Sequence, residues 1–188
     1  KKNMKKSALL TAVAALLISV AGYAQDSEKL VSSVSHIKFF STTPAEDIEA
    51  NNTASVSTIN KTTGEVVFSV PMQGFEFDKR LMQKHFNSRK FLDTKSFPKA
   101  KLKGRITNLN EIDFTKDSTY KAVVEGELTI KGNTNPVKEK GTVSVKGSKV
   151  KVYSQFNVTL ADYGIEFVKG KPASNIAKTI EVTVNAEY

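Results

Sequence analysis

The chain has 188 residues, no cysteine and a formal net charge of +9. The lack of cysteine excludes structural disulfides, thiol catalysis and cysteine-ligated zinc. Four of the 28 basic residues lie within the first six positions, which leaves 24 bases against 19 acids, a net +5, for the remainder. No basic motif interleaved with aromatic residues occurs, so the sequence does not indicate a nucleic-acid partner.

The first 24 residues have the pattern of a secretory signal. Lysines open the chain, residues 8–21 are almost wholly apolar, and Gly22-Tyr23-Ala24 places small residues where signal peptidase reads them. The alternative is a single membrane anchor, but the apolar run is shorter than the roughly 20 residues of a spanning helix. We expect cleavage near Ala24 and one domain, residues 25–188, in the periplasm or outside the cell.

The start of this domain mixes strand and helix patterns. Residues 30–40 and 51–60 are typical of strands, although both alternate sets of 30–40 carry apolar side chains. Between them, 44–50 has Pro44 at a plausible first helical position and three carboxylates close behind it. This piece predicts a one-turn helix whose dipole the acids complement, rather than a metal site.

The next stretch changes period. Residues 66–73 alternate as a strand, and about 78–92 then show the three- and four-residue spacing of a helix face. The apolar side of this helical insert carries Leu81, Met82, His85 and Phe86.

The second half of the chain alternates regularly between apolar and polar residues. Strands are predicted over 99–106, 119–131, 137–146, 150–160 and 176–186. Turn formers at 132–136 and at Gly147-Ser148 separate three of them into hairpins. Glu139 is the exception on the apolar side of its strand, which suggests an open strand end.

These patterns predict an all-β fold, a single antiparallel eight-stranded barrel with a short helical insert at about 78–92. Closing such strands into a barrel removes exposed edges. Gly104, Gly126 and Gly141 lie on the inward set, where small residues indicate either tight bends or free volume. An eight-stranded barrel is either filled by its side chains or holds one slender ligand.

Three motifs lie in a fixed order along the domain. They are His85-Phe86-x-Ser88-x-x-Phe91-Leu92-Asp93-x-x-x-Phe97-Pro98, then Gly126-x-Leu128-Thr129-Ile130-x-Gly132-x-Thr134-x-Pro136-Val137, and then Asp162-Tyr163-Gly164-Ile165. The chain resembles the YceI-like family in these segments. The resemblance implies an exported, lipocalin-like barrel whose apolar tunnel holds a polyisoprenoid or a similar amphiphilic lipid, with no cofactor.

The inward aromatic and branched residues are the candidate walls of a lipid site. They are Phe68, Val70, Met72, Phe75, Phe77, Met82, His85, Phe86, Phe91, Leu102, Ile106, Tyr120, Val124, Leu128, Val143, Val152 and Phe156. The alternative is that they fill a solid barrel, which docks to envelope proteins through its basic outer face. His85 has two interpretations as well, a packed residue bonded to nearby backbone or a contact for a ligand headgroup.

Catalysis is not indicated. No G-x-S-x-G nucleophile elbow occurs, and His85 has no marked catalytic partner in the sequence. His36 and His85, far apart and without cysteine, do not suggest zinc. Glu125 and Glu127 share one strand face and are expected to point to solvent. Transient contact with a membrane surface or envelope proteins, and a homodimer, are compatible with the composition.

Overall fold

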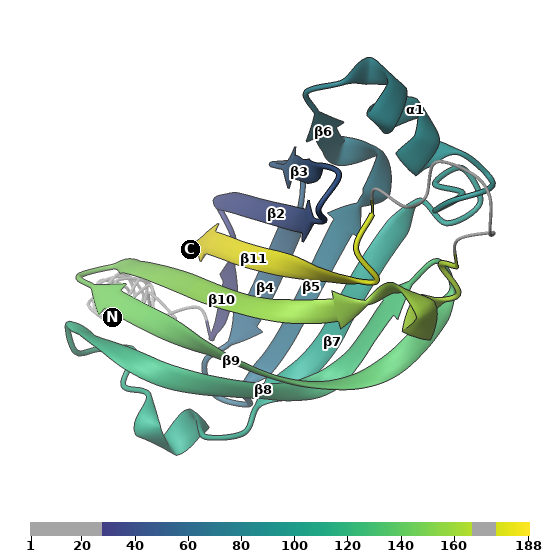
Figure 1. The fold of residues 1–188 in the computed structure, drawn as a ribbon. Coiled ribbons are helices and arrows are strands. Elements are labelled where there is room, and N and C mark those ends of the chain that lie inside the picture. The colour runs from purple at the N-terminus through teal and green to yellow at the C-terminus, as the bar shows by residue number, and fades with distance from the viewer. Residues whose placement is uncertain (1–27, 167–175) are drawn as a thin grey trace, which may run out of the picture.

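The structure, a computed structural model, describes residues 28–166 and 176–188. Within them one antiparallel sheet of eleven strands is accompanied by one α-helix and three short 3₁₀ helices (Figure 1). The strands are β1 (Lys29–Val31), β2 (Val34–Thr42), β3 (Asp47–Asn52), β4 (Val56–Asn60), β5 (Glu65–Pro71), β6 (Phe75–Phe77), β7 (Lys99–Ile106), β8 (Ser118–Ile130), β9 (Asn133–Lys146), β10 (Lys149–Thr159) and β11 (Thr179–Glu187). The helices are α1 (Arg80–Asn87), η2 (Met72–Gly74), η3 (Leu109–Glu111) and η4 (Leu160–Tyr163).

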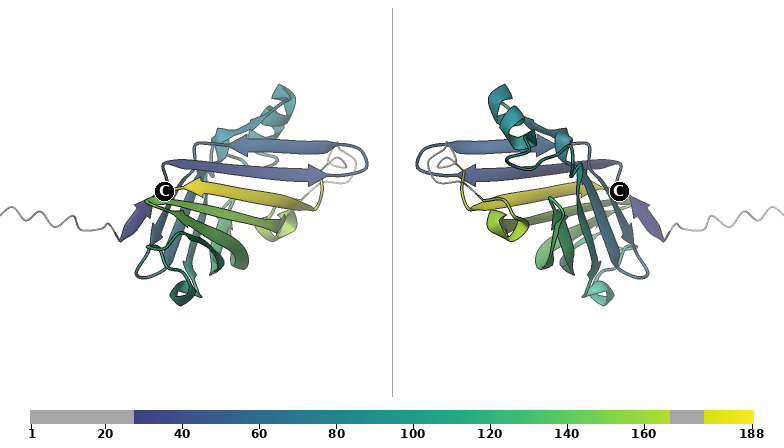
Figure 2. Two further views of the ribbon diagram at one scale, coloured as in Figure 1. Left: turned by 90° about the vertical axis from the view of Figure 1, so that its left-hand side faces the viewer. Right: turned by 90° about the vertical axis from the view of Figure 1, so that its right-hand side faces the viewer.

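The sheet is curled so strongly that its two ends approach each other. Its strand order is β1-β4-β5-β7-β8-β9-β10-β11-β2-β3-β6. The chain pairs with β4 as β1, at one end of the sheet, and a few residues later with β11 as β2, which is third from the other end. The side views show the strong curl of the sheet, with α1 projecting at the top (Figure 2).

Hydrogen bonds, two of them between hydroxyl groups, link β4 and the residue before it to β2 and the chain segments beside it. Ser55 Oγ donates to Ser35 Oγ at 2.8 Å, and the hydroxyls of Ser57 and Tyr188 share a hydrogen bond of 2.6 Å. The backbone N–H of Ser32 donates to the carbonyl of Ser57 at 2.9 Å. We call these five residues the hydroxyl seam. Its bonds satisfy polar groups that burial would otherwise leave costly.

The outer face of the sheet carries alternating charges. Lys103 lies opposite Glu127, and Arg105 lies opposite Glu125, across the β7–β8 ladder. Lys138 on β9 forms an ion pair of 2.6 Å with Glu125. Both glutamates are exposed, as the sequence predicted. Because acids face bases across the strands, this face is mixed in charge rather than a continuous basic patch.

The prediction of an all-β antiparallel fold with one short helix is confirmed. The closed eight-stranded barrel is wrong, because eleven strands form one strongly curled sheet with β1 and β6 at its two ends. The helix expected over 44–50 is also wrong, because β3 occupies most of it. Ile48, Ala50 and Asn52 alternate toward the interior and are buried. Pairing with β2 on one side and β6 on the other outweighs the weak helical signal of a few acidic residues.

The turn expected over 132–136 is shorter than predicted. Lys131 and Gly132 form a two-residue loop with φ values of 50° and 78°, and β9 starts at the next residue. A Cβ on Gly132 would also meet the ring of Phe97. The loop therefore favours glycine for its backbone geometry and for space. Pro136, assigned to the turn from sequence, lies inside β9.

Glycines on the inner face mark a tight bend rather than free volume. Gly104 and Gly126 lie directly opposite each other across the β7–β8 ladder. A Cβ on Gly126 would collide with the carbonyl oxygen of Lys103 and the Cα of Gly104. Close backbone approach is one of the uses of glycine in strands, and here it allows the sheet to curl.

The helical insert is confirmed but shorter than predicted, since α1 covers Arg80–Asn87. The predicted signal, residues 1–24, lies outside the described residues. Among the helices that are described, none combines the length and apolar character needed to cross a membrane.

Candidate functional site

The curled sheet encloses a cavity of about 760 Å³. Each strand from β2 to β11 contributes at least one side chain to its walls, which are overwhelmingly apolar. Protein interiors normally contain few voids larger than a water molecule. A volume within the roughly 300–1,000 Å³ of ligand pockets is therefore a candidate binding site and not a packing defect.

The structure brings sixteen of the seventeen predicted wall residues to this cavity. From β5 to the segment after α1 they are Phe68, Val70, Met72, Phe75, Phe77, Met82, His85, Phe86 and Phe91, and from β7 to β10 they are Leu102, Ile106, Val124, Leu128, Val143, Val152 and Phe156. Tyr120 is the exception. It is half-buried near the start of β8, and its hydroxyl donates to the carbonyl of Lys116 at 3.2 Å.

Five phenylalanines line the cavity beneath α1. Phe86 is buried at their centre, with ring centroids 5.0 Å from Phe77, 5.6 Å from Phe75, 5.7 Å from Phe39 and 6.2 Å from Phe91. These spacings lie within the range of favourable aromatic pairs. The cluster fixes α1 to the sheet and forms a rigid apolar wall. Sequence reasoning missed Phe39, because both alternate sets of its strand are apolar.

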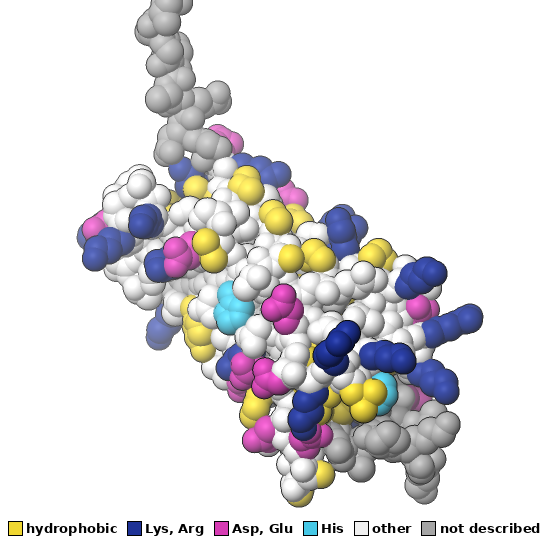
Figure 3. Space-filling view, turned by 90° about the horizontal axis from the view of Figure 1, so that it is seen from above, with side chains coloured by type: hydrophobic (Ala, Val, Ile, Leu, Met, Phe, Trp, Pro, Cys, Tyr) yellow, Lys and Arg dark blue, Asp and Glu magenta, His cyan; other side chains and the backbone are white. Residues whose placement is uncertain are grey.

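The cavity opens beside α1. Leu81, although 64% exposed, lines it, and so do Lys79 and Lys90 from the two sides of the helix. The Lys79 ammonium forms an ion pair with Glu46. Seen from above, Lys and Arg side chains crowd the α1 side of the molecule, with apolar side chains between them (Figure 3). A polar rim around an apolar interior suits an amphiphile better than a fully apolar molecule.

His85 stands at this opening and is exposed. The interpretation of a packed histidine is therefore wrong. The helix face predicted from spacing also splits, because Phe86 is buried whereas Leu81 and His85 face outward. The buried face of α1 differs from the predicted one because the helix contacts the sheet mainly through β6.

Glu139 is the functional candidate that the sequence signalled but that we misread. It lies in the middle of β9, opposite Val124 of β8, and lines the cavity. Burial raises the pKa of its carboxyl above the ordinary value. Its position on the apolar alternate set marks an inward carboxyl and not a strand end.

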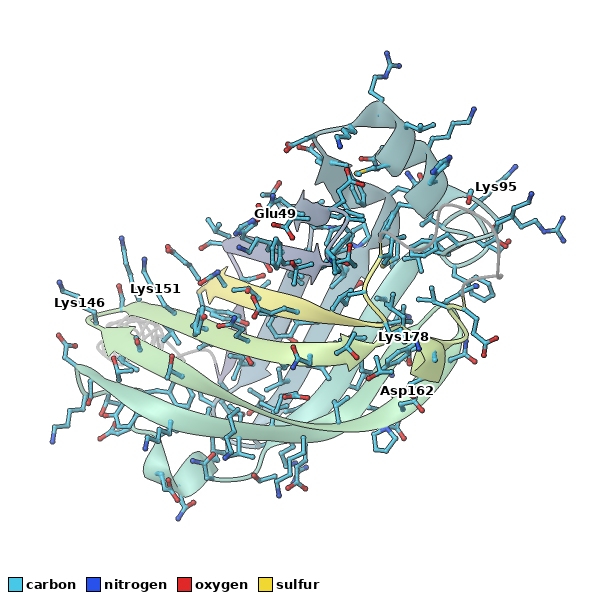
Figure 4. The ribbon with its side chains drawn as sticks, in the orientation of Figure 1. Glu49, Lys95, Lys146, Lys151, Asp162 and Lys178 are labelled. Carbon is cyan, nitrogen blue, oxygen red and sulfur yellow. The ribbon has the colours of Figure 1, made fainter. Side chains whose placement is uncertain are left out.

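Carboxylates on the outer face behave differently. A hydrogen bond from Asn51, followed by the nearby ammonium of Lys38, lowers the pKa of Glu49. A hydrogen bond from Lys151 and the charge of that ammonium lower the pKa of Glu187. Glu49 and Lys151 point away from the sheet interior, as does Lys146 at the β9–β10 turn (Figure 4). In the described ranges no group of three His, Cys, Asp or Glu side chains could hold a metal ion.

The sequence profile of the YceI-like domain matches residues 23–188. No curated protein matches the chain. Solved structures do. The chain is similar to BcnA of Burkholderia cenocepacia, at 16% identity and a TM-score of 0.67, over 82% of this chain and 96% of that one.

Two further structures share the fold. A polyisoprenoid binding domain from Saccharophagus degradans is 13% identical, with a TM-score of 0.70 over 84% of this chain and 97% of that one. A YceI protein from Campylobacter jejuni is 12% identical, with a TM-score of 0.53 over 72% and 79%. The fold, the three motifs and a profile match over nearly the whole chain agree: the chain belongs to the YceI-like family.

Proposed function

We propose that this protein binds a long apolar amphiphile in its cavity, such as a polyisoprenoid, a quinone or a related lipid, and carries or sequesters it. The observation that supports this most directly is the apolar cavity of about 760 Å³. Burial of hydrocarbon contributes about 0.8 kcal/mol per CH₂ group. A chain of a few isoprene units along these walls would therefore be held strongly.

The similar fold of the Saccharophagus domain, described as polyisoprenoid binding, is consistent with this ligand class. The N-terminal signal pattern supports a site of action in the periplasm or outside the cell. Transient contact with a membrane surface, by which the lipid is taken up or delivered, fits the cations beside the α1 opening. The absence of a recognisable catalytic motif in the sequence supports a binding role over an enzymatic one.

The competing interpretation was a solid barrel that docks through a basic face. Two observations disfavour it. The interior contains a large cavity, and Lys103 and Arg105 of β7 lie opposite glutamates of β8.

The first test is native mass spectrometry of the full chain expressed with its own N-terminal segment and purified without detergent, followed by organic extraction. We expect one apolar lipid per protein. A lipid-free mass that persists after incubation with polyprenols, quinones and fatty acids would refute the proposal.

A matched pair of variants ties the lipid to the cavity. Ala122 is inward and lines the cavity, whereas its neighbour Lys121 is exposed on the outer face. Ala122→Phe is expected to weaken lipid retention at least tenfold, and Lys121→Phe to leave it unchanged. Leu128→Trp provides a second filling position should the first variant fold poorly. Full retention in a folded Ala122→Phe or Leu128→Trp protein would place the lipid elsewhere.

A further inference from the structure

Strands β9 and β10 are paired along only half of their length. Their ladder runs from Lys146–Lys149 to Gly141–Ser154. Beyond that point β10 pairs with β11 alone, and the first half of β9 pairs with β8 alone. The two strands visibly diverge (Figure 1). We call the gap between residues 133–140 and 155–159 the window.

The window is bounded at its far end and is not a frayed edge. There η4 and the residue after it are tied back to the β8–β9 turn. Asn133 Nδ2 donates to the carbonyl of Tyr163 at 2.9 Å, and Asn135 Nδ2 donates to the carbonyl of Asp162 at 2.7 Å. Lys131 Nζ donates to the carbonyl of Gly164 at 3.0 Å.

The cavity reaches the window. Its lining includes Glu139 and Lys140 on one side and Ser154 and Phe156 on the other. Where the ladder ends it also includes Tyr153, an outward-facing residue that is 44% exposed. The window is therefore a second opening, in the wall of the sheet, with β10, β11, β2 and β3 between it and β6, the strand next to α1.

Glu139 points into this part of the cavity with little to compensate its charge. None of the ion pairs between described residues includes it; its neighbour Lys138 is paired with Glu125 on the outer face. Tyr163, which is buried, has its pKa raised by burial first and then by the negative charges of Asp162 and Glu139. The hydroxyl of Ser154, at the ladder end on β10, already donates to the carbonyl of Lys140 at 2.7 Å.

A carboxylate at the position of Glu139 needs a hydrogen-bond donor. Against plain hydrocarbon it would lose part of its hydration without gaining a hydrogen bond. A phosphate or carboxylate headgroup would bring like charges together in a partly buried site. A hydroxyl group is uncharged and donates the hydrogen bond that the carboxylate lacks, and hydrogen bonds to a charged acceptor are stronger than neutral ones.

We propose that Glu139 is the headgroup-selecting residue of this cavity and that the cargo carries an uncharged hydrogen-bond donor, as a long-chain or polyisoprenoid alcohol does. The alcohol group lies at the window, and the hydrocarbon extends past Phe156 and Val124 into the cavity. The inference rests on the proposed function and narrows it, because phosphorylated, carboxylated and acceptor-only headgroups are disfavoured at this position.

The test compares three lipids with one hydrocarbon chain: oleyl alcohol, methyl oleate and oleic acid. Each displaces a fluorescent fatty probe from the lipid-free full chain at mildly alkaline pH. We expect the alcohol to bind about tenfold more tightly than the ester and the acid, the effect of about 1.4 kcal/mol. Glu139→Leu should abolish the preference for the alcohol over the ester. Glu139→Gln keeps an acceptor but removes the charge, so it should improve oleic acid about tenfold and weaken the alcohol, whose hydroxyl would then donate to a neutral acceptor.

The matched control is Glu127→Gln, which removes an exposed carboxylate from the outer face of β8. It should alter none of the three affinities. If the wild-type protein binds all three lipids equally and the Glu139 variants do the same, the headgroup inference is overturned and the proposed function stands. If no lipid displaces the probe and the purified protein carries none, the proposed function itself fails.

Discussion

The sheet lacks a backbone ladder at two places in its circuit, and the molecule treats them in opposite ways. At the hydroxyl seam, Ser35 and Ser57 are only 3% and 1% exposed. Side-chain hydrogen bonds link Ser35 of β2 to Ser55, just before β4, and Ser57 of β4 to Tyr188, just after β11. At the window, none of the hydrogen bonds in the described part of the chain joins 133–139 to 155–159, and the cavity reaches the gap. A missing ladder thus becomes an opening only where the flanking side chains do not bond to each other.

The largest expected effect comes from removing the curl that brings the two sides of the seam together. Gly126→Leu forces a side chain against the backbone of β7, so we expect a loss of at least about 3 kcal/mol of unfolding free energy or a loss of cooperative folding. Gly147→Asn is the control, because a Cβ there meets nothing within 4 Å and asparagine tolerates the φ of 58°. Thermal melts monitored by circular dichroism test this prediction. A Gly126→Leu melt like that of the wild type would contradict the close approach of the β7 and β8 backbones.

The second-largest effect should be the weakening of the hydroxyl seam at alkaline pH. Burial, partly offset by the hydrogen bond with Ser57, raises the pKa of Tyr188 to about 12 from an ordinary value of 10.0. Below pH 10 the phenol is neutral in both states, so it adds no pH dependence. Between pH 10 and about 12 the unfolded chain ionises first. The free energy of unfolding therefore falls over this pH range, by about 2–3 kcal/mol.

The comparison that isolates this effect is Tyr188→Phe. Denaturant melts at a series of alkaline pH values should show the difference in stability between wild type and Tyr188→Phe shrinking or reversing as the pH rises. A constant difference would mean that Tyr188 ionises alike in both states.

Removing a single hydrogen bond of the hydroxyl seam should destabilise the protein less than the two changes above. Ser57→Ala leaves the Tyr188 hydroxyl without its partner inside the seam, which we expect to cost about 1–3 kcal/mol. Ser69→Ala, at a half-buried position on the outward alternate set of β5, is the control and should change stability by less than about 0.5 kcal/mol. Equal effects of the two changes in urea melts would show that the seam bonds add no stability.

The smallest expected effect is a gain in stability, and it comes from a substitution at the window. Because burial raises the Glu139 pKa, the folded lipid-free protein loses stability as the pH rises through that pKa. Glu139→Gln removes the charge, so we expect a melting temperature up to about 3 °C higher at neutral pH, corresponding to about 1 kcal/mol or less. The gain should vanish in acid. A destabilised Glu139→Gln protein at neutral pH would indicate that the carboxylate has a protein partner after all.

The alternation of apolar and polar residues was enough to predict the face of β5 and of β7 to β10, and hence most of the cavity wall. Once the sheet curls, its apolar face is the lining, and this is why Leu102, Val124 and Phe156 all meet the same space. The number of strands was not predictable in this way. The short strands β1, β3 and β6 hold only three to six residues each, too few for a period to show.

Residues decided by neighbours distant in sequence were also missed. Phe39 faces inward because of its register with Val182 and Ala50, which no local pattern reveals. Glu139 did break the local pattern, but its meaning depends on where β10 leaves β9. The choice between bend and free volume at Gly126 depended on Gly104 lying directly opposite.

The proline within β9 has a consequence for the window beyond its shape. Two strand edges that face a gap are potential templates for a strand from another molecule. Pro136 has no N–H to give to such a strand, and Lys138 and Lys140 are exposed and charged along the same edge. A hydrocarbon chain needs neither hydrogen bonds nor opposite charge to pass between β9 and β10. We therefore expect the window to admit lipid while resisting the edge-to-edge pairing that leads to aggregation.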